Sequence, residues 1–261
     1  MMAKSNLYEV NGHKLYVLNR GPSKGPVVIL LHHGLGSVRA WRKQIPALAS
    51  AGYRTIAIDR WGYGRSDPRP ALSPPTFIDD QQDLLSLMDQ LGISQAELVG
   101  HSDGGTLALY FAIAYPERVS CLVTVSAHIY LDQIMVSGIQ GVHQLFEGDG
   151  DFLRKFCRAH GDKYETVFKN WYNGWFKVDF QNWDMRPLLS QITCPLLVTQ
   201  GSKDEQGTPE QARDIAKAIK GAELWFNLDA MHMMPVEKPD EFNHRLLEFL
   251  AQHLQRELIY S

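Results

Sequence analysis

The sequence predicts an α/β fold in which helices cover a doubly wound, mostly parallel sheet. Three observations lead to this fold class. Apolar runs of strand length recur along the chain, helical stretches separate them, and 261 residues suit one large α/β domain with an insertion. Continuous apolar runs are typical of strands that are buried on both faces, which is why we expect a parallel sheet.

The first predicted element is a hairpin. Short apolar runs at residues 7–10 and 15–18 flank the segment Asn11-Gly12-His13-Lys14. An Asn-Gly pair between two such runs favours a tight turn that joins antiparallel strands. We therefore expect an antiparallel edge to the sheet.

Strands and helices then alternate along the chain. Strands are predicted at residues 26–32, 53–59, 97–100, 119–126, 195–201 and 223–228. Helices are predicted at about 38–51, 77–91, 103–114, 209–219 and 239–258. A helix that joins two parallel strands gives a βαβ unit, from which doubly wound sheets are built.

The alternation is interrupted between residues 128 and 189. This segment is too long for an unstructured connection, so we expect a helical cap subdomain there and a core of residues 1–127 and 190–261. Five of its aromatic residues follow the spacing of one helix face: Phe168, Trp171, Tyr172, Trp175 and Phe176. They form either the interior of the cap or part of the roof of an apolar pocket.

Composition argues against several classes of function. The net charge is −3 and the basic residues are scattered singly, which is atypical of nucleic-acid binding. No apolar run approaches a membrane span and the first residues lack the apolar stretch of a secretory signal, so a cytoplasmic location is expected. The three cysteines, Cys121, Cys157 and Cys194, indicate neither disulfides nor a metal site and are expected to be buried.

The segment G-H-S-D-G at residues 100–104 carries the main chemical signal. It matches G-x-S-x-G at the point where a predicted strand ends and a helix begins, which is the context that gives the pattern its meaning. Glycines two residues before and after Ser102 permit a tight turn with the hydroxyl at its tip. Ser102 is therefore a candidate nucleophile.

A serine nucleophile needs a base and a third group that orients the base. His232 lies in the loop after the last predicted strand, and Asp204 lies in the loop after the preceding strand. Both loops leave the carboxyl ends of strands, where open α/β sheets place their sites. His32, His33 and His101 flank the presumed site, and we expect them to orient loops through hydrogen bonds.

Together these motifs resemble those of the α/β-hydrolase fold serine hydrolases with a helical cap. The likeness spans nearly the whole chain, through L-L-H-H-G-L-G-S (30–37), D-R-W-G-Y-G-R-S-D (59–67), G-H-S-D-G-G (100–105), G-S-K-D-E (201–205) and the His232 loop. The resemblance implies that Ser102, Asp204 and His232 form a triad and that the backbone N–H groups of Leu35 and Asp103 form an oxyanion hole. We expect a small-molecule substrate, no cofactor or metal, and a monomer or homodimer.

The resemblance leaves the reaction open, because members of the family cleave esters, amides, thioesters, epoxides, carbon–halogen bonds or carbon–carbon bonds. Ser102 stands where epoxide hydrolases and haloalkane dehalogenases of this fold carry a carboxylate, which argues against those two activities. We expect hydrolysis of small to medium esters with an apolar portion, with carbon–carbon bond cleavage as the alternative. One departure is Met231, because such proteins usually carry Gly before the triad His.

Asp103 places a carboxylate beside the presumed nucleophile. It either stabilises the start of its helix or faces a cationic group of the substrate. The run S-D-G-G is similar to that of valacyclovirase-like α-amino-acid ester hydrolases, in which a carboxylate recognises a substrate ammonium. Trp171, Trp175 and Met233 are further candidates for substrate contact, because such side chains suit an apolar, adaptable pocket.

Two other interpretations stay open. Gly34-Leu35-Gly36, with Asp59 at the end of the next strand, is close to a dinucleotide-binding fingerprint, although Arg39 replaces its third glycine. A ligand receptor of this fold would keep the triad but turn over slowly. Binding of a nicotinamide cofactor would favour the first, and a burst of acyl release without sustained turnover would favour the second.

Overall fold

The computed structural model describes residues 4–176 and 182–260; residues 1–3, residues 177–181 of the predicted insertion and Ser261 lie outside the described residues. Within these ranges an eight-stranded sheet has the order β1-β2-β4-β3-β5-β6-β7-β8. The strands are β1 (Lys4–Val10), β2 (His13–Arg20), β3 (Val27–Leu31), β4 (Arg54–Asp59), β5 (Ala96–His101), β6 (Val119–Val125), β7 (Leu196–Gly201) and β8 (Glu223–Asn227). The strands from β4 to β8 pair in parallel, so the predicted fold class is confirmed.

The first two strands form the predicted antiparallel edge. Val10 pairs with His13 across a two-residue turn, and β2 continues into antiparallel pairing with β4. Asn11 has φ 49° and Gly12 has φ 86°. Two consecutive positive φ values match the right-handed twist of a hairpin, which is why Asn-Gly is favoured there.

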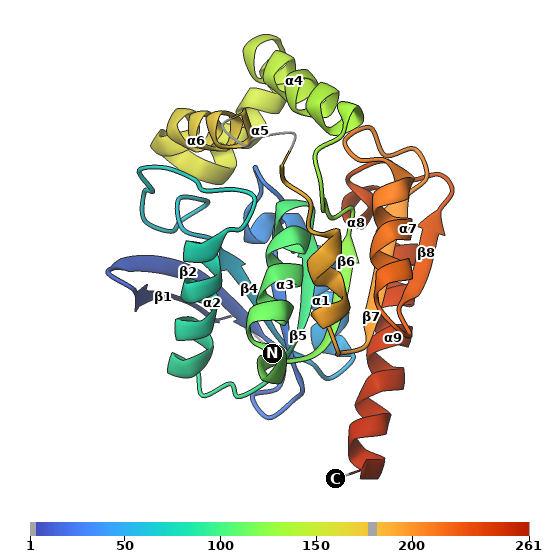
Figure 1. Ribbon diagram of the computed structural model, residues 1–261. Helices are drawn as coiled ribbons and strands as arrows, with labels where there is room; N and C mark the ends of the chain where they lie inside the picture. The colour runs from blue at the N-terminus through green and yellow to red at the C-terminus, as the bar shows by residue number, and fades with distance from the viewer. Residues whose placement is uncertain (1–3, 177–181, 261) are drawn as a thin grey trace.

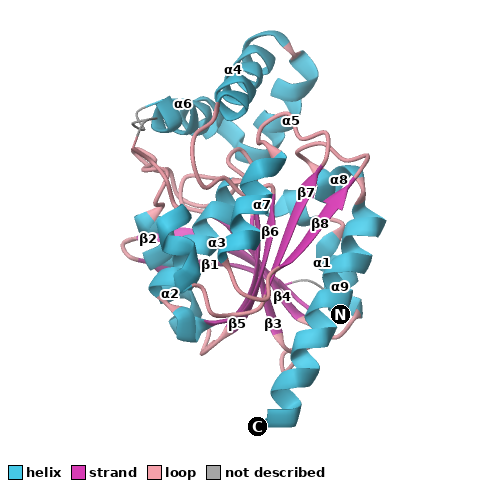
Figure 2. Cartoon of the chain, turned by 45° about the vertical axis from the view of Figure 1, so that its right-hand side comes forward, coloured by secondary structure: helices cyan, strands magenta, loops and turns pink. Residues whose placement is uncertain are grey.

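Each central strand contributes to two apolar cores. In β3, Val28 and Leu30 belong to one core, whereas Ile29 and Leu31 belong to the other. Alternate side chains of a strand point to opposite faces, so a continuous apolar run buries both. Figure 2 shows the result, a sheet between two layers of helices.

The helices of these two layers range from three residues in η2 to 22 residues in α9. They are η1 (Val38–Trp41), α1 (Gln44–Ser50), α2 (Ile78–Gln90), α3 (Asp103–Ala114), η2 (Pro116–Arg118), α7 (Pro209–Ala218), α8 (Met234–Glu237) and α9 (Pro239–Tyr260). One core includes the buried side chains of α2, α3 and α7, and the other includes those of α1 and α9. No helix among the described residues is long and apolar enough to cross a membrane.

A helical insertion lies between β6 and β7. It contains α4 (Gln133–Gly148), α5 (Gly150–His160), η3 (Gly161–Lys163), α6 (Tyr164–Phe176) and η4 (Arg186–Gln191). Figure 1 shows α4, α5 and α6 together above one end of the sheet. This is the helical excursion expected between residues 128 and 189, although its treatment as a separate subdomain stays a prediction.

Three local expectations need correction. The helix predicted over residues 38–51 is divided into η1 and α1, because Pro46 lacks an N–H and fits only the first turn of a helix. Helix α8 was not predicted, since four residues carry no periodic pattern. Only Cys121 is buried, whereas Cys157 and Cys194 are half-buried.

Candidate active site

Ser102 occupies a strained turn between β5 and α3. Its backbone has φ 54° and ψ −120°, a conformation that non-glycine residues seldom adopt and that is typical of functional positions. A Cβ on Gly100 would lie 2.1 Å from the Gly104 carbonyl oxygen, and one on Gly104 would lie 2.2 Å from that of Leu31. The glycines on both sides of Ser102 are therefore required by close backbone contact, as the sequence indicated.

His232 and Asp204 form a buried pair. The Nδ1 of His232 lies 2.9 Å from Oδ1 and 3.1 Å from Oδ2 of Asp204, and their side chains are 3% and 0% exposed. The backbone N–H groups of Gln206 and Gly207 donate to the same Asp204 oxygen. Asp204 is thus fixed as an acceptor that orients the imidazole.

The loop that carries His232 lies directly against the serine turn. The Nε2–H of His101 donates to the His232 carbonyl oxygen at 2.8 Å, and the ring centroids of His101 and His232 are 5.2 Å apart. Within the described residues, Ser102 Oγ makes no hydrogen bond to His232. Such contacts often tighten only when a substrate is bound, so the arrangement is compatible with proton transfer.

The charge state of the pair follows from burial and from its mutual attraction. Burial acts to lower the pKa of His232, but the carboxylate of Asp204, aided by Glu205 and Asp103, outweighs it and raises that pKa above its ordinary value. Burial acts to raise the pKa of Asp204, but the charge and hydrogen bond of His232 hold it well below its usual range. Asp204 is therefore ionised at neutral pH, and His232 is the member of the pair that can gain and lose a proton.

Glu237 of α8 fixes the His232 loop from both sides. It accepts hydrogen bonds from the N–H groups of Met231 at 2.7 Å and Met233 at 3.1 Å. Met231 does not have a positive φ, so the loop does not need the usual glycine there. Room for the loop comes instead from Gly201, where a Cβ would lie 2.3 Å from the Ala230 carbonyl oxygen.

The predicted oxyanion donors are both available. Among the described residues, the backbone N–H groups of Leu35 and Asp103 donate to no other atom. Asp103 opens α3, so its N–H is one of the free donors of a helix start. A Cβ on Gly34 would lie 2.7 Å from the Oδ2 of Asp103, which places the Leu35 loop against the serine turn.

A histidine from the insertion anchors the Leu35 loop. The N–H of Gly64 donates to Nδ1 of His160 at 3.0 Å, so the Nε2–H of this neutral ring donates to the Leu35 carbonyl oxygen at 3.0 Å. Burial lowers the pKa of His160 to about 4, which keeps the ring neutral. The sequence predicts only an ordinary surface or structural residue at His160, because nothing near it in the chain points to Leu35.

The other site histidines are also neutral and structural. The N–H of Arg60 donates to Nε2 of His32 at 3.1 Å, and Nδ1–H of His32 donates to the His33 carbonyl oxygen at 2.7 Å. These bonds and that of His101 confirm the expected loop-orienting role for His32 and His101. The ring of His33 makes an edge contact with His101 and no hydrogen bond among the described residues, so its role stays a prediction. His128 stacks on His232 with ring centroids 5.8 Å apart, and burial lowers its pKa to about 4.

The Asp103 side chain faces a cation of the chain itself. Its Oδ2 lies 3.8 Å from Nη2 of Arg60, and both side chains are almost fully buried. Burial raises the pKa of Asp103 to about 6, against the opposing effects of Arg60 and of a hydrogen bond from Trp175. The geometry of the pair is loose, because Oδ2 accepts no hydrogen bond among the described residues.

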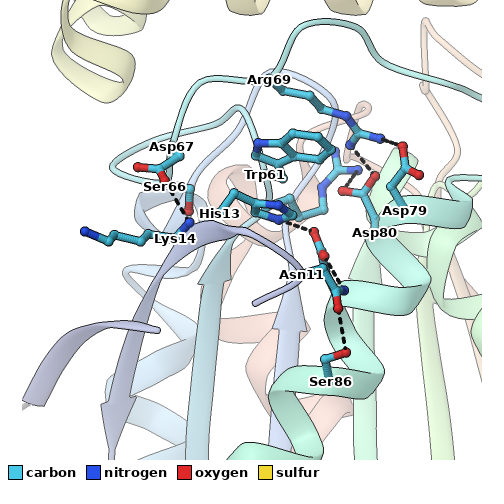
Figure 3. A network of polar contacts seen from close by, with 12 residues as sticks. Asn11, His13, Lys14, Trp61, Ser66, Asp67, Arg69, Asp79, Asp80 and Ser86 are labelled. Carbon is cyan, nitrogen blue, oxygen red and sulfur yellow. Dashed lines mark hydrogen bonds and ion pairs between the residues drawn. The ribbon is translucent and has the colours of Figure 1, made fainter. Parts of the chain in front are cut away.

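Arg60 belongs to a wider buried network that holds the loop after β4. Its Nη1 lies 3.6 Å from Asp80, and Asp80 also accepts a 2.6 Å hydrogen bond from Arg69. Figure 3 shows Arg69 reaching Asp79 and Asp80, with Trp61 lying on the ring of His13. The loop that begins at residue 59 is therefore held to α2 and α3 by the buried charges of Arg60, Asp80 and Asp103.

The aromatic stripe of α6 is divided between two environments. Phe168 stacks on Phe146 of α4 at 3.8 Å between centroids, so this part forms the interior of the insertion. Trp171 turns its indole nitrogen toward Gly34, 2.1 Å from the position of a Cβ there, and this nitrogen has no hydrogen-bond partner among the described residues. Trp175 lies against His128. The two tryptophans thus border the serine turn, and Met233 lines a neighbouring groove.

Asp59, the acidic residue of the dinucleotide-like pattern, binds backbone N–H groups of this chain. Its Oδ1 accepts from the N–H of Val38 at 2.6 Å, and its Oδ2 accepts from that of Arg65 at 2.8 Å. Both carboxylate oxygens of Asp59 are therefore used to hold the backbone at Val38 and at Arg65. In the described part of the chain, no group of three or more His, Cys, Asp or Glu residues is arranged to hold a metal.

Comparison with known proteins agrees with this geometry. A profile of the alpha/beta hydrolase fold matches residues 26–168. The human protein named serine hydrolase BPHL is 31% identical over 250 residues, which cover 92% of this chain and 84% of that protein. The 2-hydroxy-6-oxo-6-phenylhexa-2,4-dienoate hydrolase of Comamonas testosteroni is 28% identical over 261 residues, covering 88% of this chain and 89% of that one.

Solved structures share the fold over nearly the whole chain. A hydrolase from Pseudomonas aeruginosa PA01 aligns with a TM-score of 0.78 and 23% identity, covering 95% of this chain and 98% of that one. Similarity to epoxide hydrolase 2 of Siraitia grosvenorii reaches 39% identity but extends over 148 residues only. This chain spans 45% of the length of that relative.

Proposed function

Because this chain belongs to the α/β-hydrolase fold family, we propose that it is a serine hydrolase that cleaves carboxylic esters through an acyl-enzyme. One observation carries the proposal, the strained turn that holds Ser102 with φ 54° at the start of α3. The buried His232–Asp204 pair packs beside that turn. A serine so placed is suited to nucleophilic catalysis.

Each proposed step has a residue of this chain. Ser102 Oγ attacks the ester carbonyl carbon and its proton passes to Nε2 of His232, whose Nδ1 faces Asp204 at 2.9 Å. The N–H groups of Leu35 and Asp103 stabilise the oxyanion. Collapse expels the alcohol, which takes the proton from His232, and water then hydrolyses the acyl-enzyme by the same route.

Replacing Ser102 tests the mechanism. Ser102→Ala removes the nucleophile, so kcat for a 4-nitrophenyl ester should fall by about four to six orders of magnitude. The far-ultraviolet circular dichroism spectrum and the melting temperature of the variant should stay close to those of the original protein. A folded variant whose kcat lies within tenfold of that of the original protein would contradict the assignment of Ser102 as the nucleophile.

A second candidate reaction is hydrolysis of a carbon–carbon bond on the same residues. The full-length similarity to the dienoate hydrolase of Comamonas testosteroni favours it. A panel of alkyl esters, thioesters, ring-opening dienoates and epoxides separates the candidates by kcat/KM. We expect esters to have the highest kcat/KM of the panel. Epoxides should not react, because Ser102 stands where epoxide hydrolases of this fold carry a carboxylate nucleophile. The same panel tests a slow-turnover receptor, which would release acyl product once without sustained turnover.

An α-amino group on the substrate is a finer alternative. Asp103 Oδ2 accepts no hydrogen bond among the described residues, which favours a ligand donor. Arg60, however, already provides a buried cation 3.8 Å from that oxygen. We therefore propose that substrates without an ammonium group are accepted, with Arg60 balancing the charge of Asp103.

A further inference from the structure

A groove with an apolar floor opens between the Leu35 loop and α5. Its volume is about 700 Å³, and its apolar lining consists of Leu35, Ala40, Phe152, Phe156, Ala159, Met233 and Val236. Leu35 carries a proposed oxyanion donor, and Met233 follows His232 directly. One end of the groove therefore adjoins the proposed catalytic residues.

The rim of this groove is basic. Arg39, Arg42, Lys155 and Arg158 line it, and the described lining contains no carboxylate. Arg39 and Arg158 also line an adjoining hollow of about 380 Å³, so the two cavities share their positive wall. A concentration of cations is notable in a chain whose net charge is −3.

Three of these cations have no counter-ion. Lys155 pairs with Asp151 at 2.5 Å, but Arg39, Arg42 and Arg158 form no ion pair among the described residues. Several arginines elsewhere on the surface are paired, as in Arg118–Asp89 and Arg213–Glu210. Guanidinium groups without partners around an apolar floor suit a ligand that is apolar along its length and anionic at its end.

We propose that the groove binds the part of the substrate remote from the reaction, and that this part is an apolar segment ending in an anion. The inference rests on the proposed function and narrows it to anionic esters or thioesters. The apolar segment would lie on Phe152 and Phe156, and the carboxylate or phosphate would bind the three arginines. Exposed cations also raise the association rate of an anionic substrate, an effect that salt weakens.

Paired substrates test the charge preference. One arm compares 4-nitrophenyl monoesters of C6 to C10 dicarboxylic acids with the corresponding methyl-capped diesters. A second arm compares an acyl-coenzyme A with the same acyl group on N-acetylcysteamine, which distinguishes a phosphate on the leaving group from a carboxylate on the acyl group. We expect kcat/KM to favour the anionic member of one pair by about tenfold, and less at 1 M salt.

The triple variant Arg39→Gln, Arg42→Gln, Arg158→Gln should remove this preference, lowering the anionic-to-neutral ratio by about tenfold. Lys24→Gln, an exposed cation on the loop before β3, is the matched control and should leave the ratio unchanged. A ratio near one in both arms, or a ratio that survives the triple substitution, would overturn the proposal.

A binding measurement separates this inference from the proposed reaction. Calorimetric titration of Ser102→Ala with octanoate and with octanamide needs no turnover. Tighter binding of octanoate that is lost with the three arginine substitutions supports the groove even if no ester is hydrolysed. Equal affinity for the two ligands counts against it even if ester hydrolysis is confirmed.

Discussion

His232 shows how single residues set the chemistry of the site. It is 2% exposed, and burial alone would favour the neutral ring. The carboxylates of Asp204, Glu205 and Asp103 instead raise its pKa above the ordinary value of 6.5. Because a general base must be unprotonated, kcat/KM should be low in acid and should rise with pH through the pKa of His232.

Asp103→Asn should shift this rise to lower pH. Asp103 has a pKa raised to about 6 by burial, so its charge is present above that pH and stabilises protonated His232. Without the charge, the pKa of His232 falls because its protonated form loses a stabilising carboxylate. The acid limb of the kcat/KM profile for a neutral ester therefore shifts to lower pH. Asp79→Asn, whose partly exposed carboxylate lies on α2, serves as the control.

The same variant also decides the role of the Asp103 side chain. With Arg60 as its partner, the rate ratio between amino-acyl esters and matched neutral esters should change by less than about threefold. A ratio that falls by tenfold or more would instead assign the carboxylate to a substrate ammonium. An unshifted pH profile would contradict the electrostatic coupling of Asp103 to His232.

At the scale of elements, α5 and the Leu35 loop act together. The ring of His160 at the end of α5 bridges the N–H of Gly64 and the carbonyl oxygen of Leu35, each at 3.0 Å. The residue whose N–H is the proposed oxyanion donor is thus held, through its carbonyl oxygen, by the insertion. The insertion therefore contributes to the geometry of the site as well as to its cover.

His160→Ala should lower kcat by about tenfold while KM changes less than twofold, because a displaced oxyanion donor affects the transition state more than substrate binding. Steady-state kinetics on one ester measures both values. His160→Gln keeps a donor and an acceptor and should recover part of the loss. His143→Ala on α4, where the ring stacks on Tyr172 instead, should have little effect on kcat. Equal losses for both alanine variants would refute a positioning role for His160.

At the scale of the whole molecule, buried charges tie the loop after β4 to α2 and α3. Asp80 is 1% exposed in its side chain and lies between Arg60 and Arg69, while Asp103 faces Arg60 from α3. Removing one partner of such a network leaves a buried charge without compensation, which costs far more than loss of a surface pair. The network should therefore contribute to global stability.

Asp80→Asn should lower the free energy of unfolding by about 3–5 kcal/mol, because two buried guanidinium groups lose their shared carboxylate. Asp79→Asn should cost less than about 1 kcal/mol, because Asp79 is 42% exposed in its side chain. Urea unfolding followed by tryptophan fluorescence measures both. Similar losses for the two variants would show that the buried network is not the source of stability.

Local chemistry in the sequence was sufficient to predict the sheet, the first hairpin, the helix that starts at Asp103 and the turn at Ser102. These features depend on side-chain periodicity and on the steric freedom of neighbouring glycines, both of which are properties of short segments. The sequence order also placed Asp204 and His232 in loops at the same edge of the sheet, and the structure shows them paired.

Only the tertiary structure could place Arg60 beside Asp103, Glu237 beneath the His232 loop and His160 on the carbonyl oxygen of Leu35. His160 and Leu35 are separated by 125 residues, and nothing periodic in the sequence links them. Such contacts arise because parallel strands bring their carboxyl ends, and the insertion above them, to one edge of the sheet. The residues that bear the chemistry are therefore local signals, whereas the residues that orient them and set their charge are decided by the packing of distant segments.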